Sequence, residues 1–397
     1  MARNILVFNK RHVIIATVFL FALIAGGLFA EDPFIDSPLL PVSPEVFGQG
    51  GSFVANAHGY NALFHNPAGF AGEEGSFTVL SSTAWVYANP YRAFQALGNT
   101  DPSPLISFVE DEITAGGFGF GFSEGIGYVG KGVGLGAVLN VDSYLWGPTT
   151  LGAVGRMDAT LAFIGGLALP INLFGIKINL GADLRPMIRI RAPLDYTVMF
   201  DMIDALQNGG NPLEALNTVD TLHGYAFGLD LGAIAELGDL RLGISVRDFL
   251  GTRFTYKENQ FADIVSSLRS TGGFPAVGTE VDDYVIPMDV SVGVSYHLDF
   301  GSLSAVLDPV VHASLNDLIG VIRDERSPWT LLHVGTEIGL FRFLKLRGGF
   351  NQGYVTLGAG VDLSIFELNA ALFTREMGKH IGDRPNAGMT VEAAIRF

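Results

Sequence analysis

The sequence predicts an all-β membrane protein: an antiparallel transmembrane barrel of about fourteen strands with a short N-terminal plug. Three observations lead to this fold class. Apolar and polar residues alternate through many long stretches, tight and long connections alternate between those stretches, and the chain ends on Phe397 at the end of an amphipathic stretch.

The alternation is clearest in residues 176–191. Ile178 and Leu180 fall on one face of this stretch, and Lys177 and Asn179 fall on the other. Successive side chains of a strand point to opposite faces, so a period of two residues indicates a strand. The same period recurs in three further stretches: 240–247, 288–298 and 344–350.

The connections between the predicted strands alternate in length. The strands are expected near 75–82, 117–129, 132–146, 157–169, 174–191, 223–236, 239–249, 287–298, 301–313, 330–340, 343–350, 353–361, 363–374 and 387–397. Tight turns such as 130–132 and 237–238 alternate with loops, of which the longest are 83–116, 192–222 and 250–286. Short turns on one side and long loops on the other are typical of a bacterial outer-membrane barrel with both termini in the periplasm.

The last strand carries a separate signal. Val391, Ile395 and Phe397 share its apolar face, and Thr390 and Glu392 lie on the other. A chain that ends in this way resembles the signature read by the barrel-insertion machinery. We therefore expect that machinery and outer-membrane lipid as partners of the chain.

The N-terminus is interpreted as a signal peptide over residues 1–30. Arg3, Lys10 and Arg11 precede an apolar run that reaches Ala30, and the last residues of this run are mostly small, as a cleavage site requires. The alternative is an uncleaved anchor helix, because the run is long enough to span a membrane.

Composition excludes several classes of function. The chain has no cysteine and a formal charge of −16, so a disulfide framework, a thiolate metal site and nucleic-acid binding are not expected. Its eight histidines show no metal-ligand spacing, and we expect no metal and no cofactor. Ser295 and His297 would share a strand face, but nothing marks them as activated, so we do not expect an enzyme.

One predicted strand breaks its own pattern. In 117–129, Glu124 falls in register with lipid-facing Phe122 and Ile126. A carboxylate facing lipid is costly, so the step Ser123-Glu124-Gly125 is predicted to be a bulge or kink in the wall.

Residues 31–74 separate the signal peptide from the first strand and carry the motif Asn66-Pro67-Ala68-Gly69. This motif resembles the hatch of FadL-like long-chain fatty acid transporters of the outer membrane and of the related PorV-like barrels of secretion systems. The resemblance implies a fourteen-stranded barrel plugged by residues 31–74. It also implies hydrophobic substrates that enter at the outer loops and leave sideways through a kinked strand. The alternative interpretation of the motif is an ordinary turn.

Two of the long loops have apolar residues at helical spacing. Loop 192–222 carries Phe200, Ile203 and Leu206, and loop 250–286 carries Phe261 and Ile264. In the family these loops form a greasy groove that admits the substrate. They could equally pack over the mouth of the barrel, since an apolar loop surface can be a site or a lid.

Charged residues are predicted to line the lumen. Arg185, Arg189 and Arg191 are the candidates for a cationic seat that would hold a fatty carboxylate. The favoured alternative is a structural network of ion pairs, because buried charges are usually paired.

The predicted function is passive transport of a hydrophobic small molecule or lipid across the outer membrane. The alternatives are a PorV-like secretion or assembly barrel, a surface antigen and, least favoured, a general diffusion porin.

Overall fold

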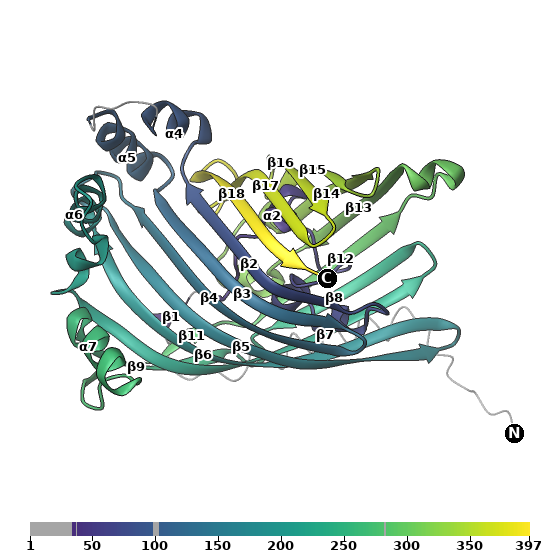
Figure 1. Ribbon diagram of the computed structural model, residues 1–397, viewed down its shortest axis with the longest axis horizontal. Helices are drawn as coiled ribbons and strands as arrows, with labels where there is room; N and C mark the ends of the chain where they lie inside the picture. Colours follow the sequence, from purple (N-terminus) through teal and green to yellow (C-terminus); the bar gives the residue numbers. More distant parts are fainter. Residues whose placement is uncertain (1–33, 37, 98–102, 282) are drawn as a thin grey trace, which may run out of the picture.

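The computed structural model describes residues 34–36, 38–97, 103–281 and 283–397. The signal peptide predicted over residues 1–30 lies outside them. A closed antiparallel sheet forms the body of the protein, and it closes where the last strand pairs with the first wall strand (Figure 1).

The wall consists of the following strands in chain order: β2 (Ser76–Tyr87), β3 (Gly119–Gly130), β4 (Val133–Trp146), β5 (Val154–Leu173), β6 (Ile176–Asp195), β7 (Asp220–Leu237), β8 (Leu240–Arg247), β9 (Thr252–Gln260), β11 (Tyr284–Ile286), β12 (Asp289–His297), β13 (Leu307–Leu315), β14 (Leu332–Leu340), β15 (Leu344–Asn351), β16 (Tyr354–Leu363), β17 (Phe366–Glu376) and β18 (Pro385–Arg396). Two further strands of two residues each pair with wall strands: β1 (Phe34–Ile35) pairs in parallel with β11, and β10 (Thr279–Glu280) pairs with β9.

Among the described residues these strands occupy fourteen positions around the barrel, as predicted. β8 and β9 pair with opposite ends of β7, so together they fill one position. β11 and β12 pair with β9 and β8 in the same way. The interruption between β8 and β9 contains Asp248, Leu250 and Gly251, all with positive φ. The prediction that 250–286 is one loop is therefore wrong at both ends, because 252–260 and 284–286 belong to the wall.

The remaining long connections carry helices, which lie together at one end of the barrel (Figure 1). They are α4 (Pro90–Leu97), α5 (Ser103–Ala115), α6 (Tyr196–Gln207), the 3-10 helix η2 (Pro212–Leu216) and α7 (Phe261–Thr271). Three shorter helices, η3 (Gly301–Ala305), α8 (Leu318–Arg323) and η4 (Pro328–Leu331), lie beside β13 and β14 in the chain. β2 continues to Tyr87, so the first long loop begins a few residues later than the predicted 83–116.

The two faces of the wall differ in polarity. Side chains such as Phe163, Leu184, Phe227 and Leu357 are exposed on the outside, whereas the buried positions between them are mostly small or polar. An apolar outer band around a polar interior is the pattern of a transmembrane barrel. Among the helices of the described residues, none is long and apolar enough to cross a membrane.

The segment 38–75, called the inner segment below, lies inside the ring of strands. It contains α2 (Pro44–Gly48), α3 (Ala62–His65) and the 3-10 helix η1 (Pro67–Ala71). α2 packs against β15, β16 and β17, and η1 packs against β5, β6 and β7 on the other side of the barrel. Most residues of the inner segment are buried.

Candidate functional site in the lumen

The Asn66-Pro67-Ala68-Gly69 motif forms the start of η1. The Asn66 side chain accepts a hydrogen bond from the backbone N–H of Ala68 at 3.0 Å, which caps the helix. Its amide nitrogen donates to the backbone carbonyls of Val54 at 2.8 Å and of Ile244 at 3.2 Å. One buried side chain thus joins η1 to another part of the inner segment and to wall strand β8. An ordinary surface turn would not make these contacts.

The wall is shaped to receive the inner segment by a set of lumen-facing glycines, called the glycine belt below. A Cβ atom added to any of them would lie between 1.6 and 3.3 Å from an atom of the inner segment, which is closer than ordinary packing allows. The belt consists of Gly125, Gly127, Gly134, Gly136, Gly166, Gly181, Gly232, Gly243, Gly293, Gly335, Gly349 and Gly358. At Gly181, Gly243, Gly335, Gly349 and Gly358 the neighbouring atoms of the inner segment belong to its backbone, and only glycine permits so close an approach between two backbones. At the other positions the neighbours are side-chain atoms, such as the hydroxyl of Tyr60 and the ring of Phe70.

The contacts of the glycine belt show the course of the inner segment. Gly358 on β16 meets Gly48, Gly243 on β8 meets Ala55, and Gly181 on β6 meets Pro67. The inner segment therefore follows the inside of the wall around the barrel. Along this whole path, glycines in the wall sequence leave the room that the inner segment occupies.

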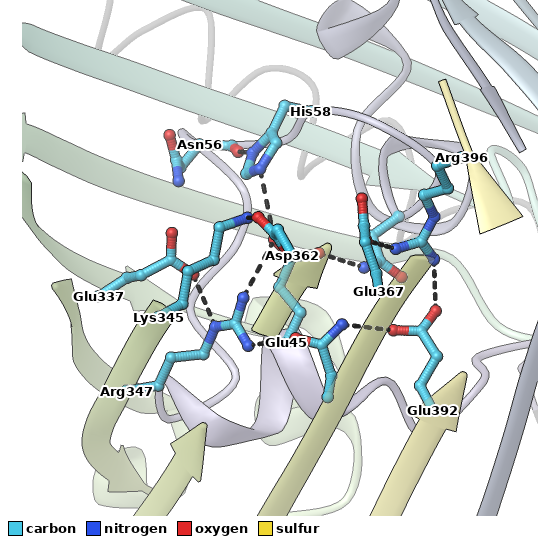
Figure 2. Close-up of polar contacts among 12 residues, drawn as sticks. Glu45, Asn56, His58, Glu337, Lys345, Arg347, Asp362, Glu367, Glu392 and Arg396 are labelled. Atoms are coloured by element: carbon cyan, nitrogen blue, oxygen red, sulfur yellow. Dashed lines mark hydrogen bonds and ion pairs between the residues drawn. The ribbon is translucent and has the colours of Figure 1, made fainter. Parts of the chain in front are cut away.

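Charged groups hold the α2 end of the inner segment, as Figure 2 shows. Glu45 accepts a hydrogen bond from Asn61 at 2.6 Å and lies 3.3 Å from His58 Nε2. Arg347 of β15 approaches Glu45 at 3.9 Å and donates to Glu337 at 2.6 Å. The cluster continues across the wall to the ion pair between Arg396 and Glu392.

The proton equilibria of Glu45 and His58 follow from this geometry. Burial alone would raise the pKa of Glu45, but the hydrogen bond and charge of His58, together with the charge of Arg347, lower it well below its usual value. Burial would lower the pKa of His58, but the hydrogen bond and charge of Glu45 raise it. Each group therefore stabilises the charged form of the other.

The three arginines predicted to seat a carboxylate already have acidic partners in the protein. Arg185 donates to Asp230 at 2.7 Å and to Asp248 at 3.0 Å. Both Arg189, at 2.6 Å, and Arg191 pair with Asp36. The geometry favours the structural network over the cationic seat.

The apolar loop residues gather at the helical end of the barrel. Met199 and Met202 of α6 are buried, and the predicted residues Phe200, Ile203 and Phe261 are partly buried against the same cluster. Ile264 of α7 is fully buried, and Leu206 belongs to α6. α4 and α5 complete this cluster with Ala93, Phe108 and Ile113. The structure therefore brings the predicted loop residues to one end of the barrel, and it pairs the three arginines with acids elsewhere.

The bulge predicted at Ser123-Glu124-Gly125 lies on the neighbouring strand instead. These three residues pair with both β2 and β4 in continuous register. The register shift falls on β2, between Thr78 and Ser81. Glu124 does share the outward face, as expected, and it can remain there because the hydroxyl of Ser82 on β2 donates a hydrogen bond to its carboxylate.

A cavity of about 290 Å³ lies between the inner segment, the strands β8, β12, β14, β15 and β17, and the connection from β13 to β14. Its apolar lining includes Leu40, Val46 and Phe47 of the inner segment, and its charged lining includes Arg247 and Arg375 of the wall. The alternation of residues 240–247 places Arg247 in the lumen. No sequence signal distinguishes Arg247 from the other lumen arginines, because only the fold places it at this cavity.

The chain is similar to solved structures of hydrocarbon channels. It is 13% identical to the toluene transporter TbuX of Ralstonia pickettii, with a TM-score of 0.47 over 90% of this chain and 98% of that one. The identity to the toluene transporter TodX of Pseudomonas putida is also 13%, with a TM-score of 0.45 over 92% and 99% of the two chains. For the monoaromatic hydrocarbon channel CymD the identity is 12% and the TM-score 0.48, over 90% and 97%. Neither a sequence family nor a curated protein matches the chain. At 12–13% identity and TM-scores of 0.45–0.48, this similarity assigns neither a family nor a role to the chain.

Proposed function

We propose that this protein is a passive outer-membrane transporter for hydrophobic small molecules such as long-chain fatty acids, with both termini in the periplasm. The observation that carries the proposal is the glycine belt, which commits the wall to an inner segment inside the lumen. A general diffusion porin keeps a water-filled lumen and has no use for such a belt. We interpret the inner segment as the hatch predicted for residues 31–74.

The apolar cluster at the helical end of the barrel supports capture of an apolar substrate. A molecule that leaves water gains about 25 cal/mol for each Å² of apolar surface that it buries. Phe200, Ile203 and Phe261 are only partly buried, so they offer such a surface at the mouth. In the proposed route, the substrate is captured here and then enters the lumen.

The substrate is proposed to leave sideways between β2 and β3. The register shift between Thr78 and Ser81 removes ladder hydrogen bonds at this point, and a bulge weakens pairing locally. The outward pair of Ser82 and Glu124 gives a polar border to the same site. The exit would thus lie beside Gly125, where the wall also meets Tyr60 of the inner segment.

Uptake into proteoliposomes tests the transport proposal. The purified full chain should accelerate entry of radiolabelled oleate and toluene while leaving the permeability to arabinose and chloride low. Fast swelling in arabinose, with no acceleration of oleate or toluene, would overturn the proposal in favour of a porin. No effect on any solute would favour a secretion partner or a surface protein.

A reversible disulfide tests the lateral exit. The chain has no cysteine of its own, and Ser82 and Glu124 are register partners, so Ser82→Cys with Glu124→Cys can lock β2 to β3. Oxidation should reduce oleate uptake, and reduction should restore it. The matched control locks the next part of the wall through Leu139→Cys with Leu161→Cys, which are partners on β4 and β5. Equal uptake by the oxidised and reduced Ser82–Glu124 pair would exclude this exit.

A further inference from the structure

The wall of the barrel differs in height between two opposite sides. β5 and β6 are the longest strands, with 20 residues each, whereas β14 has nine residues and β15 has eight. When β8 with β9 and β11 with β12 count as one position each, β15 and β16 lie six and seven positions away from β6. The ring has fourteen positions, so the short strands stand opposite the long ones.

On the tall side, the apolar outer surface extends over most of each strand. Every second residue of β6 from Ile176 to Ile190 faces outward, and all of them are apolar. A strand rises about 3.3 Å per residue and is tilted by about 40° in a membrane barrel, so this run is about 35 Å tall. The run from Tyr225 to Leu237 on β7 is about 30 Å tall by the same geometry. These heights match the hydrocarbon core of a typical bilayer, which is about 30 Å thick.

On the opposite side, the outer surface of β14 to β17 carries a much lower apolar run and is called the short face below. The outward apolar residues of β16 extend from Val355 to Leu363, and those of β17 from Phe366 to Leu372. These runs are about 20 and 15 Å tall by the same geometry. The apolar band of the barrel is therefore a wedge rather than a ring of constant height.

Charged side chains lie beyond both borders of the short face. Arg342 is exposed in the turn between β14 and β15, at the end of the barrel where the chain terminates. At the other end, Lys379 and Glu325 form an ion pair whose side chains are 60% and 86% exposed. The backbone N–H of Ser327 donates to the carbonyl of Lys379 at 2.7 Å, which joins the two loops that carry this pair. A bilayer with a core of about 30 Å at this face would draw such charges into hydrocarbon, which is costly.

We propose that the short face binds a locally thinned bilayer, so that the hydrocarbon core measures about 15–20 Å against β14–β17 and about 30 Å against β5–β7. Lipid fits this face because its exposed side chains, such as Leu357 and Leu368, are as large and apolar as Leu184 and Phe227 on the tall side. A bilayer adapts to a short apolar surface by thinning. The thinning follows from the barrel wall and does not depend on which molecule is transported.

Depth measurement by electron paramagnetic resonance tests the thinning. The chain has no cysteine, so Ala359→Cys on β16 and Ala182→Cys on β6 can each carry a single nitroxide label. The two alanines are matched, because both are exposed and both lie near the middle of their apolar runs. The full chain is placed in dioleoylphosphatidylcholine vesicles, and the contrast between relaxation by oxygen and by a water-soluble nickel chelate gives the depth of each label. We expect a label about 10 Å deep in the hydrocarbon core for Ala359→Cys and about 15 Å deep for Ala182→Cys, which is half of the local thickness in each case.

Two results would overturn the proposal. Equal depths of about 15 Å would mean that the bilayer keeps its thickness at the lower wall. A label on Ala359→Cys that oxygen does not reach, with spin–spin broadening between copies, would mean that a second copy of the chain covers the short face instead of lipid. If either variant fails to assemble, the exposed leucines of the same two faces repeat the comparison as Leu368→Cys and Leu184→Cys.

Discussion

The glycine belt predicts that a single added methyl group will release the inner segment from an intact barrel. In Gly181→Ala the new Cβ would lie 2.3 Å from the carbonyl carbon of Pro67 and 2.4 Å from the nitrogen of Ala68. These are backbone atoms of η1, so no side chain can rotate away and η1 must move. Gly165→Ala is the matched control, because this glycine lies on the adjacent strand and its nearest neighbour would be Leu135 at an ordinary 3.7 Å.

The magnitude follows from overpacking. Extra methyl groups in a tight site typically cost 1–3 kcal/mol, and a shift of η1 also weakens the hydrogen bonds of Asn66, each worth about 1 kcal/mol. We therefore expect the docked state of the inner segment to lose about 2–3 kcal/mol. Since 1.4 kcal/mol is a factor of ten, the undocked population should rise about thirty- to 140-fold.

Cysteine labelling measures this population. Ser52 of the inner segment is 2% exposed, and Ser52→Cys is nearly isosteric in a chain without other cysteines. Its reaction with a maleimide should accelerate by the same factor in Gly181→Ala, while heat-modified gel mobility confirms a folded barrel. Equal labelling rates in Gly181→Ala and Gly165→Ala would refute the role of the belt.

Three further predictions concern the charges and the C-terminus. The stabilisation due to His58 is complete below pH 6.5 and is lost as pH rises through its raised pKa, whereas that due to Glu45 is complete above pH 4.5 and is lost as pH falls through its lowered pKa. Divided by the rate of a free thiol at the same pH, the labelling rate of Ser52→Cys should therefore be lowest between these values. A normalised rate that does not depend on pH would contradict the pairing. Arg185→Leu should destabilise the barrel by about 3–5 kcal/mol, because it leaves the buried carboxylates of Asp230 and Asp248 without their cation. An unchanged urea midpoint of unfolding would contradict this prediction. Phe397→Ser should slow assisted insertion into outer-membrane vesicles, and insertion at the parent rate would argue against recognition of this residue.

Most of the wall can be predicted from sequence because lipid and lumen impose opposite polarities on alternate residues. The alternation rule does not predict β9, and the reason is the polarity of its two faces. Its buried residues include the aromatic Phe254 and Tyr256, and its exposed ones include Arg253 and Thr255. This polarity is the reverse of that of a lipid-facing strand, so the rule of an apolar outer face predicts a loop for 252–260.

The candidate site was less predictable because it depends on partners far apart in the chain. Arg185 and Arg247 both appear in the sequence as lumen arginines on amphipathic strands. Arg185 is matched by Asp230 and Asp248, whereas Arg247 faces the cavity, and only the fold distinguishes them. The sequence shows a high glycine content, but it does not show that these glycines face one segment. The belt is spread from Gly125 to Gly358, and only the fold brings its members around the inner segment.

The circular course of the inner segment constrains how the protein can be assembled. It contacts wall strands from β3 to β16, and the ring is completed only when β18 pairs with β2. Bulky side chains such as Phe64 and Phe70, both buried, would have to pass the constricted interior if the segment arrived after closure. The segment is synthesised before every wall strand, so it is available as a template on which the glycines align the strands. The same residues would then set the register and the circumference of the barrel during folding.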